Sequence, residues 1–214
     1  GSITTGGGSN PYAVAVQGRN AFVVNFTGNT IAAFDISNPA LPATLGTRAT
    51  GTNPSAIVVQ GRYAYVTNQG SNNFMIFDVS NPASIPAAVG TSTAVASSQP
   101  QGVAVQGRYA YVTEFGNSAL GVYDISNPAV PGAKIGTIST GTTTGPKGIS
   151  VQGRYAYIAL YTTHQMATID IATPATPLLA GTSASFGGGN NPVSLVALGR
   201  YAYVVNETSS TLQT

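Results

Sequence analysis

A Gly-Arg dipeptide recurs along the 214-residue chain at an almost constant spacing. Its arginines are separated by 43, 46, 46 and 46 residues, and they are Arg19, Arg62, Arg108, Arg154 and Arg200. The next residues read Asn-Ala-Phe-Val in the first unit and Tyr-Ala-Tyr followed by Val or Ile in the other four. An Asp stands 16 residues after each of the first four arginines, and an Asn-Pro or Thr-Pro pair follows it. A period this regular indicates one supersecondary unit repeated in tandem.

Each unit predicts four short strands, A to D in chain order. An alternating apolar run before Gln-Gly-Arg predicts strand A, and the Tyr-Ala-Tyr-Val run after the turn predicts strand B. Strand C leads into the Asp, a proline-containing turn follows, and strand D contains a Gly-Thr pair. No window shows a sustained helical period. Four strands in about 45 residues, repeated in tandem, are typical of the blades of a β-propeller.

The sequence predicts an all-β, five-blade propeller that forms a single domain over residues 1–214. The repeats cover residues 10–47, 53–91, 99–137, 145–182 and 191–214. The fifth unit ends within its strand C, and residues 2–6 match the strand D pattern of residues 137–141. We therefore expect residues 2–6 to pair beside the C-terminal strands and to complete a fifth four-stranded blade, which would protect two open edges.

This closure leaves two states open. A ring that closes on itself would be a monomer, whereas strands exchanged between chains would make a homo-oligomer. The fifth blade would be built from both chain ends in either case. The sequence alone does not separate the two states.

The composition excludes several classes of function. Charged residues make up 7% of the chain and the formal charge is +2, so we expect no nucleic-acid partner. No apolar run reaches about 18 residues, which argues against a membrane span. The chain has no Cys and a single His, so neither a thiolate or multi-His metal site nor a Ser/His/Asp triad is expected. We expect no catalytic, metal-binding or cofactor-binding residues, and no cofactor.

The 16-residue spacing predicts ion pairs within the blades. Strands B and C are antiparallel neighbours, so the Arg that begins B and the Asp that ends C should meet. The expected pairs are Arg19–Asp35, Arg62–Asp78, Arg108–Asp124 and Arg154–Asp170. Because the pairs repeat in each blade, we interpret them as structural and not as an anion site.

The positions that differ between units gather in the B–C and D–A loops, at the end of each blade opposite the Arg/Asp turns. The candidate binding face there consists of Glu114, Lys147, Tyr161, His164 and Glu207. A lone His or Lys can contact a ligand or can simply be solvated. Glu114 and Glu207 stand two blades apart, which is too far for a catalytic pair, and we interpret them as polar rim residues.

The repeat resembles the LVIVD-repeat family of bacterial propeller proteins. The matching residues are Gly-Arg-Tyr-Ala-Tyr-Val and the strand that ends Phe/Tyr-Asp-(Ile/Val)-Ser-Asn-Pro, and they cover essentially the whole chain. The resemblance implies a propeller fold and an extracytoplasmic or cell-surface setting, with no shared catalytic motif. Family members typically carry more repeats, so we expect a truncated or engineered version.

These observations predict a non-enzymatic propeller that acts as a binding or structural scaffold, with an unidentified ligand or itself as partner. One alternative is an enzyme, or a propeller that binds a small ligand or a glycan, using the B–C and D–A loops. Another is a fragment that self-assembles by exchanging strands at its two ends.

Overall fold

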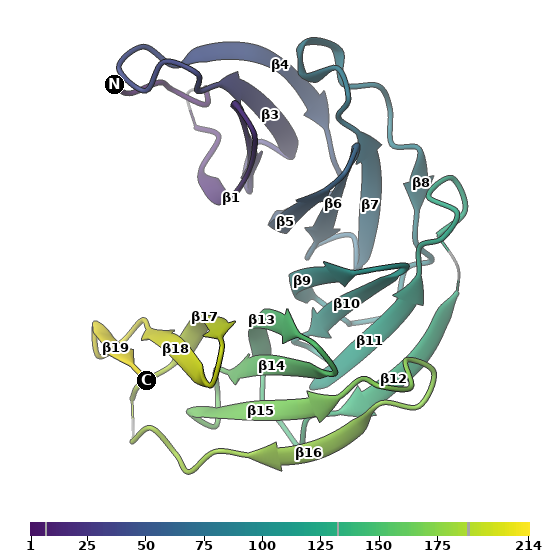
Figure 1. Cartoon of the computed structure of the whole chain (residues 1–214), viewed down its shortest axis with the longest axis vertical. Coiled ribbons are helices and arrows are strands. Elements are labelled where there is room, and N and C mark those ends of the chain that lie inside the picture. Colours follow the sequence, from purple (N-terminus) through teal and green to yellow (C-terminus); the bar gives the residue numbers. More distant parts are fainter. Residues whose placement is uncertain (7, 132, 188) are drawn as a thin grey trace. The chain divides into compact units, whose positions relative to one another are not determined.

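The computed structural model describes residues 1–6, 8–131, 133–187 and 189–214, and in this part the fold is all-β with one short 3-10 helix, η1 (Pro82–Ser84). Five antiparallel sheets follow one another in a five-blade β-propeller arrangement, and Figure 1 shows their strands. Blade 1 contains β1 (Pro11–Gln17), β2 (Asn20–Asn25), β3 (Thr30–Asp35) and β4 (Ala43–Ala49). Blade 2 contains β5 (Pro54–Gln60), β6 (Tyr63–Asn68), β7 (Asn73–Asp78) and β8 (Gly90–Thr91).

The remaining strands form three further sheets. Blade 3 contains β9 (Pro100–Gln106), β10 (Tyr109–Glu114), β11 (Ala119–Asp124) and β12 (Lys134–Ser139). Blade 4 contains β13 (Pro146–Gln152), β14 (Tyr155–Leu160), β15 (Gln165–Asp170) and β16 (Leu178–Thr182). Blade 5 contains β17 (Pro192–Leu198), β18 (Tyr201–Asn206) and β19 (Thr211–Gln213).

The Gly-Arg dipeptide makes the tight turn between the first two strands of every blade. The five turn glycines have φ between +58° and +62°, a region that residues with a side chain rarely adopt. The turn fixes the register, so that in blade 4 Tyr155 lies opposite Gln152 on one side and Asp170 on the other. The Arg that precedes strand B is thereby brought next to the Asp that ends strand C.

The chain divides into two compact units. Unit 1 comprises residues 1–96 and 127–131, and it contains blades 1 and 2. Its core is built from alternate residues of the two sheets, and its largest fully buried members are Phe22, Ile31 and Phe77. Burying each of these side chains contributes roughly 1.5–3 kcal/mol.

Unit 2 comprises residues 97–126 and 132–214, and it contains blades 3, 4 and 5. Tyr111 and Leu120 of blade 3 pack in one cluster with Ile158 and Ile169 of blade 4. A smaller cluster joins blades 4 and 5 through Ala159, Leu195 and Val204. Blades 3 and 4 therefore each bury one sheet face against the next blade.

The strand expected over residues 2–6 is not formed, and the sheet of blade 5 has three strands in the described structure. The outer strand β19 is three residues long, so its edge offers few backbone groups for another strand. The pairing of residues 2–6 with the C-terminal strands thus stays a prediction, as does the single domain over residues 1–214. The described part of the chain has no helix that is long and apolar enough to span a membrane.

Candidate functional site

Arg, Tyr and Asp side chains meet at the turn end of blades 2, 3 and 4. Ion pairs join Arg62 to Asp78, Arg108 to Asp124 and Arg154 to Asp170. Each guanidinium carbon also lies 5.3–5.6 Å from the ring centre of the Tyr that follows it. The hydrogen bond from the arginine is the largest influence on each of these carboxyl groups, and it lowers the pKa in all three cases, to about 2 for Asp78.

The expected pair Arg19–Asp35 is not among the ion pairs of the described residues. Asn20 stands where the other units have Tyr, so no aromatic ring follows Arg19 to hold its guanidinium in place. Asp35 still has a lowered pKa, but Ser37 is the main cause and Arg19 contributes least. In blade 5, Arg200 lies over the ring of Tyr201 at 5.3 Å.

Glu114 does not lie on an exposed face. Its side chain is 1% exposed, and both carboxylate oxygens accept hydrogen bonds from Lys134 Nζ, at 2.9 and 3.1 Å. The Tyr123 hydroxyl donates to the same carboxylate at 3.3 Å, and burial followed by the charge of Glu114 raises the pKa of Tyr123. The interpretation of Glu114 as a rim residue is therefore wrong, because Lys134 neutralises it inside blade 3.

Three of the candidate residues meet on the loop end of unit 2. Lys147 Nζ lies 3.6 Å from the ring centre of Tyr161 and 3.8 Å from a carboxylate oxygen of Glu207. The side chain of Lys147 is 19% exposed and that of Glu207 is 59% exposed. Burial lowers the pKa of Lys147, and the Glu207 carboxylate opposes this shift. The ring of Phe115 lies 6.3 Å from that of Tyr161.

Backbone contacts with both neighbouring blades hold this group in place. The Thr113 hydroxyl of blade 3 donates to the backbone oxygen of Lys147 at 2.6 Å. The Asn191 amide donates to the backbone oxygen of Tyr161 at 3.2 Å, and it accepts from the Thr208 hydroxyl at 2.7 Å. We call Lys147, Tyr161, Glu207, Asn191 and Thr208 the rim cluster. Sequence reasoning missed Asn191 and Thr208, which only the loop conformations bring beside the other three.

His164 lies in the same B–C loop as Tyr161, but among the described residues no hydrogen bond or ion pair of its side chain joins it to the rim cluster. Its backbone has φ +57°, and its carbonyl oxygen accepts a hydrogen bond from the Phe186 amide. The Nδ1 atom is buried and lacks a hydrogen-bond partner, as does the hydroxyl of Thr163. Among the described residues, no group of three or more His, Asp or Glu side chains is arranged to hold a metal ion.

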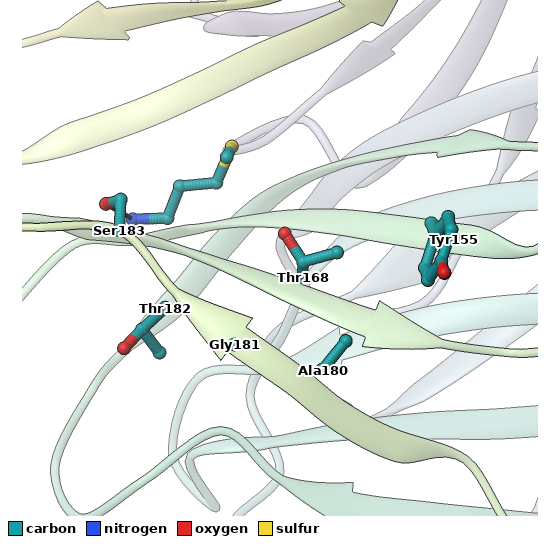
Figure 2. A pocket seen from close by; sticks show the side chains of 7 residues that line it. Tyr155, Thr168, Ala180, Gly181, Thr182 and Ser183 are labelled. Carbon is teal, nitrogen blue, oxygen red and sulfur yellow. Dashed lines mark hydrogen bonds between the residues drawn. The ribbon is translucent and has the colours of Figure 1, made fainter. Parts of the chain in front are cut away.

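Unit 2 also has two shallow grooves away from the rim cluster. One of about 420 Å³ lies on the outer part of blade 4, and Figure 2 shows its lining. Its residues are Tyr155, Met166, Thr168, Ala180, Gly181, Thr182 and Ser183. The second, of about 540 Å³, lies at the turn end of blades 3 and 4 beside Arg108 and Arg154. None of the candidate binding residues lines either groove.

Solved structures share this fold at low sequence identity. A protein from Lactobacillus plantarum matches with a TM-score of 0.81 and 18% identity, over 95% of this chain and 66% of that one. A Bacteroides uniformis protein provisionally named a 6-phosphogluconolactonase matches with a TM-score of 0.78 and 16% identity, over 92% and 64% of the two chains. The periplasmic gluconolactonase of Pseudomonas aeruginosa matches with a TM-score of 0.73 and 17% identity, over 95% and 70%.

The chain thus spans about two thirds of the length of the first of these structures. No curated protein matches it in sequence. The model of the LVIVD repeat matches residues 10–50, 53–91, 99–136 and 146–184, which correspond to blades 1 to 4. These matches cover well over half of the chain, and the chain belongs to the LVIVD repeat family.

Proposed function

We propose that this chain is a non-enzymatic propeller repeat domain that binds a carbohydrate-type ligand at the rim cluster. The observation that carries the proposal is the contact of Lys147 with both Tyr161 and Glu207. These residues come from two neighbouring blades, and they differ from their equivalents in the other units, so the blade fold alone does not require them.

The chemistry of the cluster favours a neutral, hydroxyl-rich ligand. Lys147 supplies hydrogen-bond donors, Glu207 supplies acceptors, and Tyr161 and Phe115 supply apolar ring surface. The opposite charges of Lys147 and Glu207 balance, so a strongly charged ligand gains little from the pair. The low-identity likeness to proteins named as gluconolactonases agrees with a sugar-like ligand.

Titration calorimetry with D-glucose and a panel of neutral soluble oligosaccharides tests the proposal. We expect one of these probes to bind, and the variants Tyr161→Leu and Glu207→Ala to weaken binding at least tenfold. Asp35→Ala is the matched control, because it removes a carboxylate at the other end of a blade. Failure of every probe to bind, or binding that survives both rim variants, would overturn the proposal.

An enzyme is the second candidate, and the likeness to proteins named as lactonases is what favours it. Lys147 and Glu207 would then act as the general acid and base on a lactone. Hydrolysis of D-glucono-1,5-lactone, followed by proton release, distinguishes the candidates. Turnover that falls in Lys147→Met or His164→Ala would support an enzyme. A rate equal to that of the uncatalysed reaction would instead favour the non-enzymatic binding domain. We also propose an extracytoplasmic or cell-surface setting for this protein, which its membership of the LVIVD repeat family supports.

A further inference from the structure

In each unit, the turn after strand C of one blade packs on strand D of the blade before it. In unit 2, a Cβ atom on Gly136 of β12 would clash with the backbone oxygen of Pro174, in the turn between β15 and β16. Two contacts inside unit 1 repeat this arrangement, and they are Gly46 with Pro82 and Gly90 with Pro128. Strand D has glycine at this position because the backbone of the turn leaves no room for a side chain.

Gly181 holds this position in blade 4, but no described atom lies within 4 Å of its Cβ position. It lines the groove of about 420 Å³, and Figure 2 shows it there with Thr168. The residue of blade 3 that is equivalent to Thr168 is Val122, which is buried in one apolar cluster with Ile169 and Ile171 of blade 4. The groove is therefore the surface that the end of strand C and the following turn cover where blade 4 packs on blade 3.

Strand β18 of blade 5 is paired along only part of its outer edge. Strand β19 pairs with residues 204–206, whereas residues 201–203 pair with β17 alone in the described sheet. In blade 4, the equivalent residues 155–157 pair both with β13 and with residues 168–170 of β15. Residues 201–203 therefore form an edge to which an extended segment can add.

Arg200 lacks the partners that Arg62, Arg108 and Arg154 have. In blades 1 to 4, the residue after the Asp of strand C donates its backbone N–H to the carbonyl oxygen of the Arg, at 2.8 Å in every case. In blades 2 to 4, the Asp also forms the ion pair described above. Among the described residues, Arg200 has neither this hydrogen bond nor an ion pair, and its guanidinium lies over the ring of Tyr201.

We propose that unit 2 binds an extended peptide of the pattern apolar-Asp-apolar-x-x-Pro by strand addition at this site. The peptide pairs antiparallel with residues 201–203, its Asp meets Arg200, and its proline turn enters the groove over Gly181. One segment reaches all three features, because residues 169–177 make the equivalent three contacts with blades 3 and 4. The positive charge of Arg200 and the continuity with this existing interface define the ligand as an acidic, proline-containing segment.

The occupant is a segment that is extended before it binds. Within a folded copy, the equivalent segments of blades 2, 3 and 4 already pack on the preceding strand D. The segment of blade 1 lies against Gly1 at Ala40. A second folded copy of the chain therefore has no such segment to offer.

Fluorescence anisotropy with a labelled peptide of residues 169–177, Ile-Asp-Ile-Ala-Thr-Pro-Ala-Thr-Pro, tests the proposal on the full chain. We expect saturable binding that Gly181→Val weakens about tenfold, because the branched side chain fills the place of the turn. Thr137→Val is the matched control, since it puts the same side chain on strand D of blade 3 and should leave the affinity unchanged. Urea unfolding of both variants checks that they fold.

A double-mutant cycle tests the contact between the Asp of the peptide and Arg200. Arg200→Gln in the chain and Asp170→Asn in the peptide should each weaken binding about threefold. Together they should weaken it no further than either alone, because both remove the same contact. Arg19→Gln changes the same place in blade 1 and should have no effect. Absence of saturable binding, an affinity that Gly181→Val leaves unchanged, or additive losses in the cycle would overturn the proposal.

Discussion

Arg62, in the turn before β6, pairs with Asp78 at the end of β7, and its guanidinium carbon lies 5.5 Å from the ring centre of the adjacent Tyr63. The side chain of Asp78 is only 15% exposed, whereas that of Arg62 is 59% exposed. The ring restricts the long Arg side chain and reduces the entropy lost when the ion pair forms. The ion pair therefore stabilises the folded blade only while the carboxyl group of Asp78 is ionised.

We expect Arg62→Gln to make the free energy of unfolding less dependent on pH in the acid range. The pKa of Asp78 is about 2 in the folded chain and 3.8 ordinarily, so its contribution to stability is present above pH 4 and is lost as the pH falls toward 2. Without Arg62 the folded pKa moves toward 3.8 and part of this contribution disappears. Urea unfolding should show a small loss of stability at pH 6 that shrinks at pH 2.5.

Arg19→Gln is the matched control for this prediction. Arg19 holds the same place in the repeat, but the structure gives it no ion pair with Asp35, whose lowered pKa is due mainly to Ser37. Its replacement should change unfolding little at either pH. Equal effects of the two substitutions would contradict the role assigned to the Arg–Tyr–Asp arrangement.

The repeat made most of the fold predictable. The constant 16-residue spacing, together with antiparallel strands, is enough to place an Arg beside an Asp in blades 2, 3 and 4. The spacing was not enough to place the ion pair in blade 1. There Asn20 replaces the Tyr of the other units, so no aromatic ring holds the guanidinium of Arg19 beside Asp35. The strand expected over residues 2–6 needs a neighbouring strand to pair with, and its own sequence pattern carries no information about the length of that neighbour.

The candidate site was less predictable, because it too depends on contacts between segments that a local sequence pattern does not encode. Lys147, Tyr161 and Glu207 stand out because they differ between units, but their meeting depends on how two blades pack. Glu114 also differs between units, and its burial depends on Lys134, which is 20 residues away and on another strand. Comparing the units at Lys134 and Tyr123 could have revealed this pair, since both positions change together with Glu114.

The buried pair of blade 3 predicts unequal costs for its two partners. Lys134→Leu leaves the carboxylate of Glu114 buried without its counter-ion, and we expect it to lower the free energy of unfolding by about 3–5 kcal/mol. Glu114→Leu should cost less, because the side chain of Lys134 is 23% exposed and can turn toward water. Chemical denaturation of each variant measures both values.

The double variant Glu114→Leu with Lys134→Leu should be more stable than Lys134→Leu alone. Blade 4 has Leu160 at the position of Glu114, and its Leu179 lies opposite Ile169 as Lys134 lies opposite Tyr123. The double variant thus reproduces an apolar solution that the repeat already uses, and it leaves no uncompensated charge. Additive losses of stability would contradict a direct coupling between the two side chains.

The rim cluster predicts a change in the titration of Lys147. Burial lowers its pKa and the Glu207 carboxylate raises it, so Glu207→Gln should lower the pKa further. The carbon-13 shift of the Lys147 side chain, followed against pH by NMR, measures the change. Thr208→Val is the control, because it alters the same loop without removing a charge. An unchanged or raised pKa in Glu207→Gln would show that the two charges do not interact in solution.

Two glycines at equivalent positions of strand D predict opposite effects of the same substitution. A Cβ atom on Gly136 in blade 3 would lie 2.2 Å from the backbone oxygen of Pro174, which belongs to the turn between β15 and β16. A Cβ atom on Gly181 in blade 4 would meet no described atom within 4 Å. The difference follows from the architecture, since the three-stranded sheet of blade 5 presents no such turn to blade 4.

Gly136→Ala should therefore lower the free energy of unfolding by about 1–3 kcal/mol, because the backbone of the neighbouring turn must move to admit the methyl group. Gly181→Ala should be neutral or should stabilise the chain by up to about 1 kcal/mol, because alanine restricts the unfolded chain and the folded site has room. Urea unfolding of both variants at the same pH gives the comparison. A loss in Gly181→Ala as large as that in Gly136→Ala would mean that another turn covers Gly181 in solution.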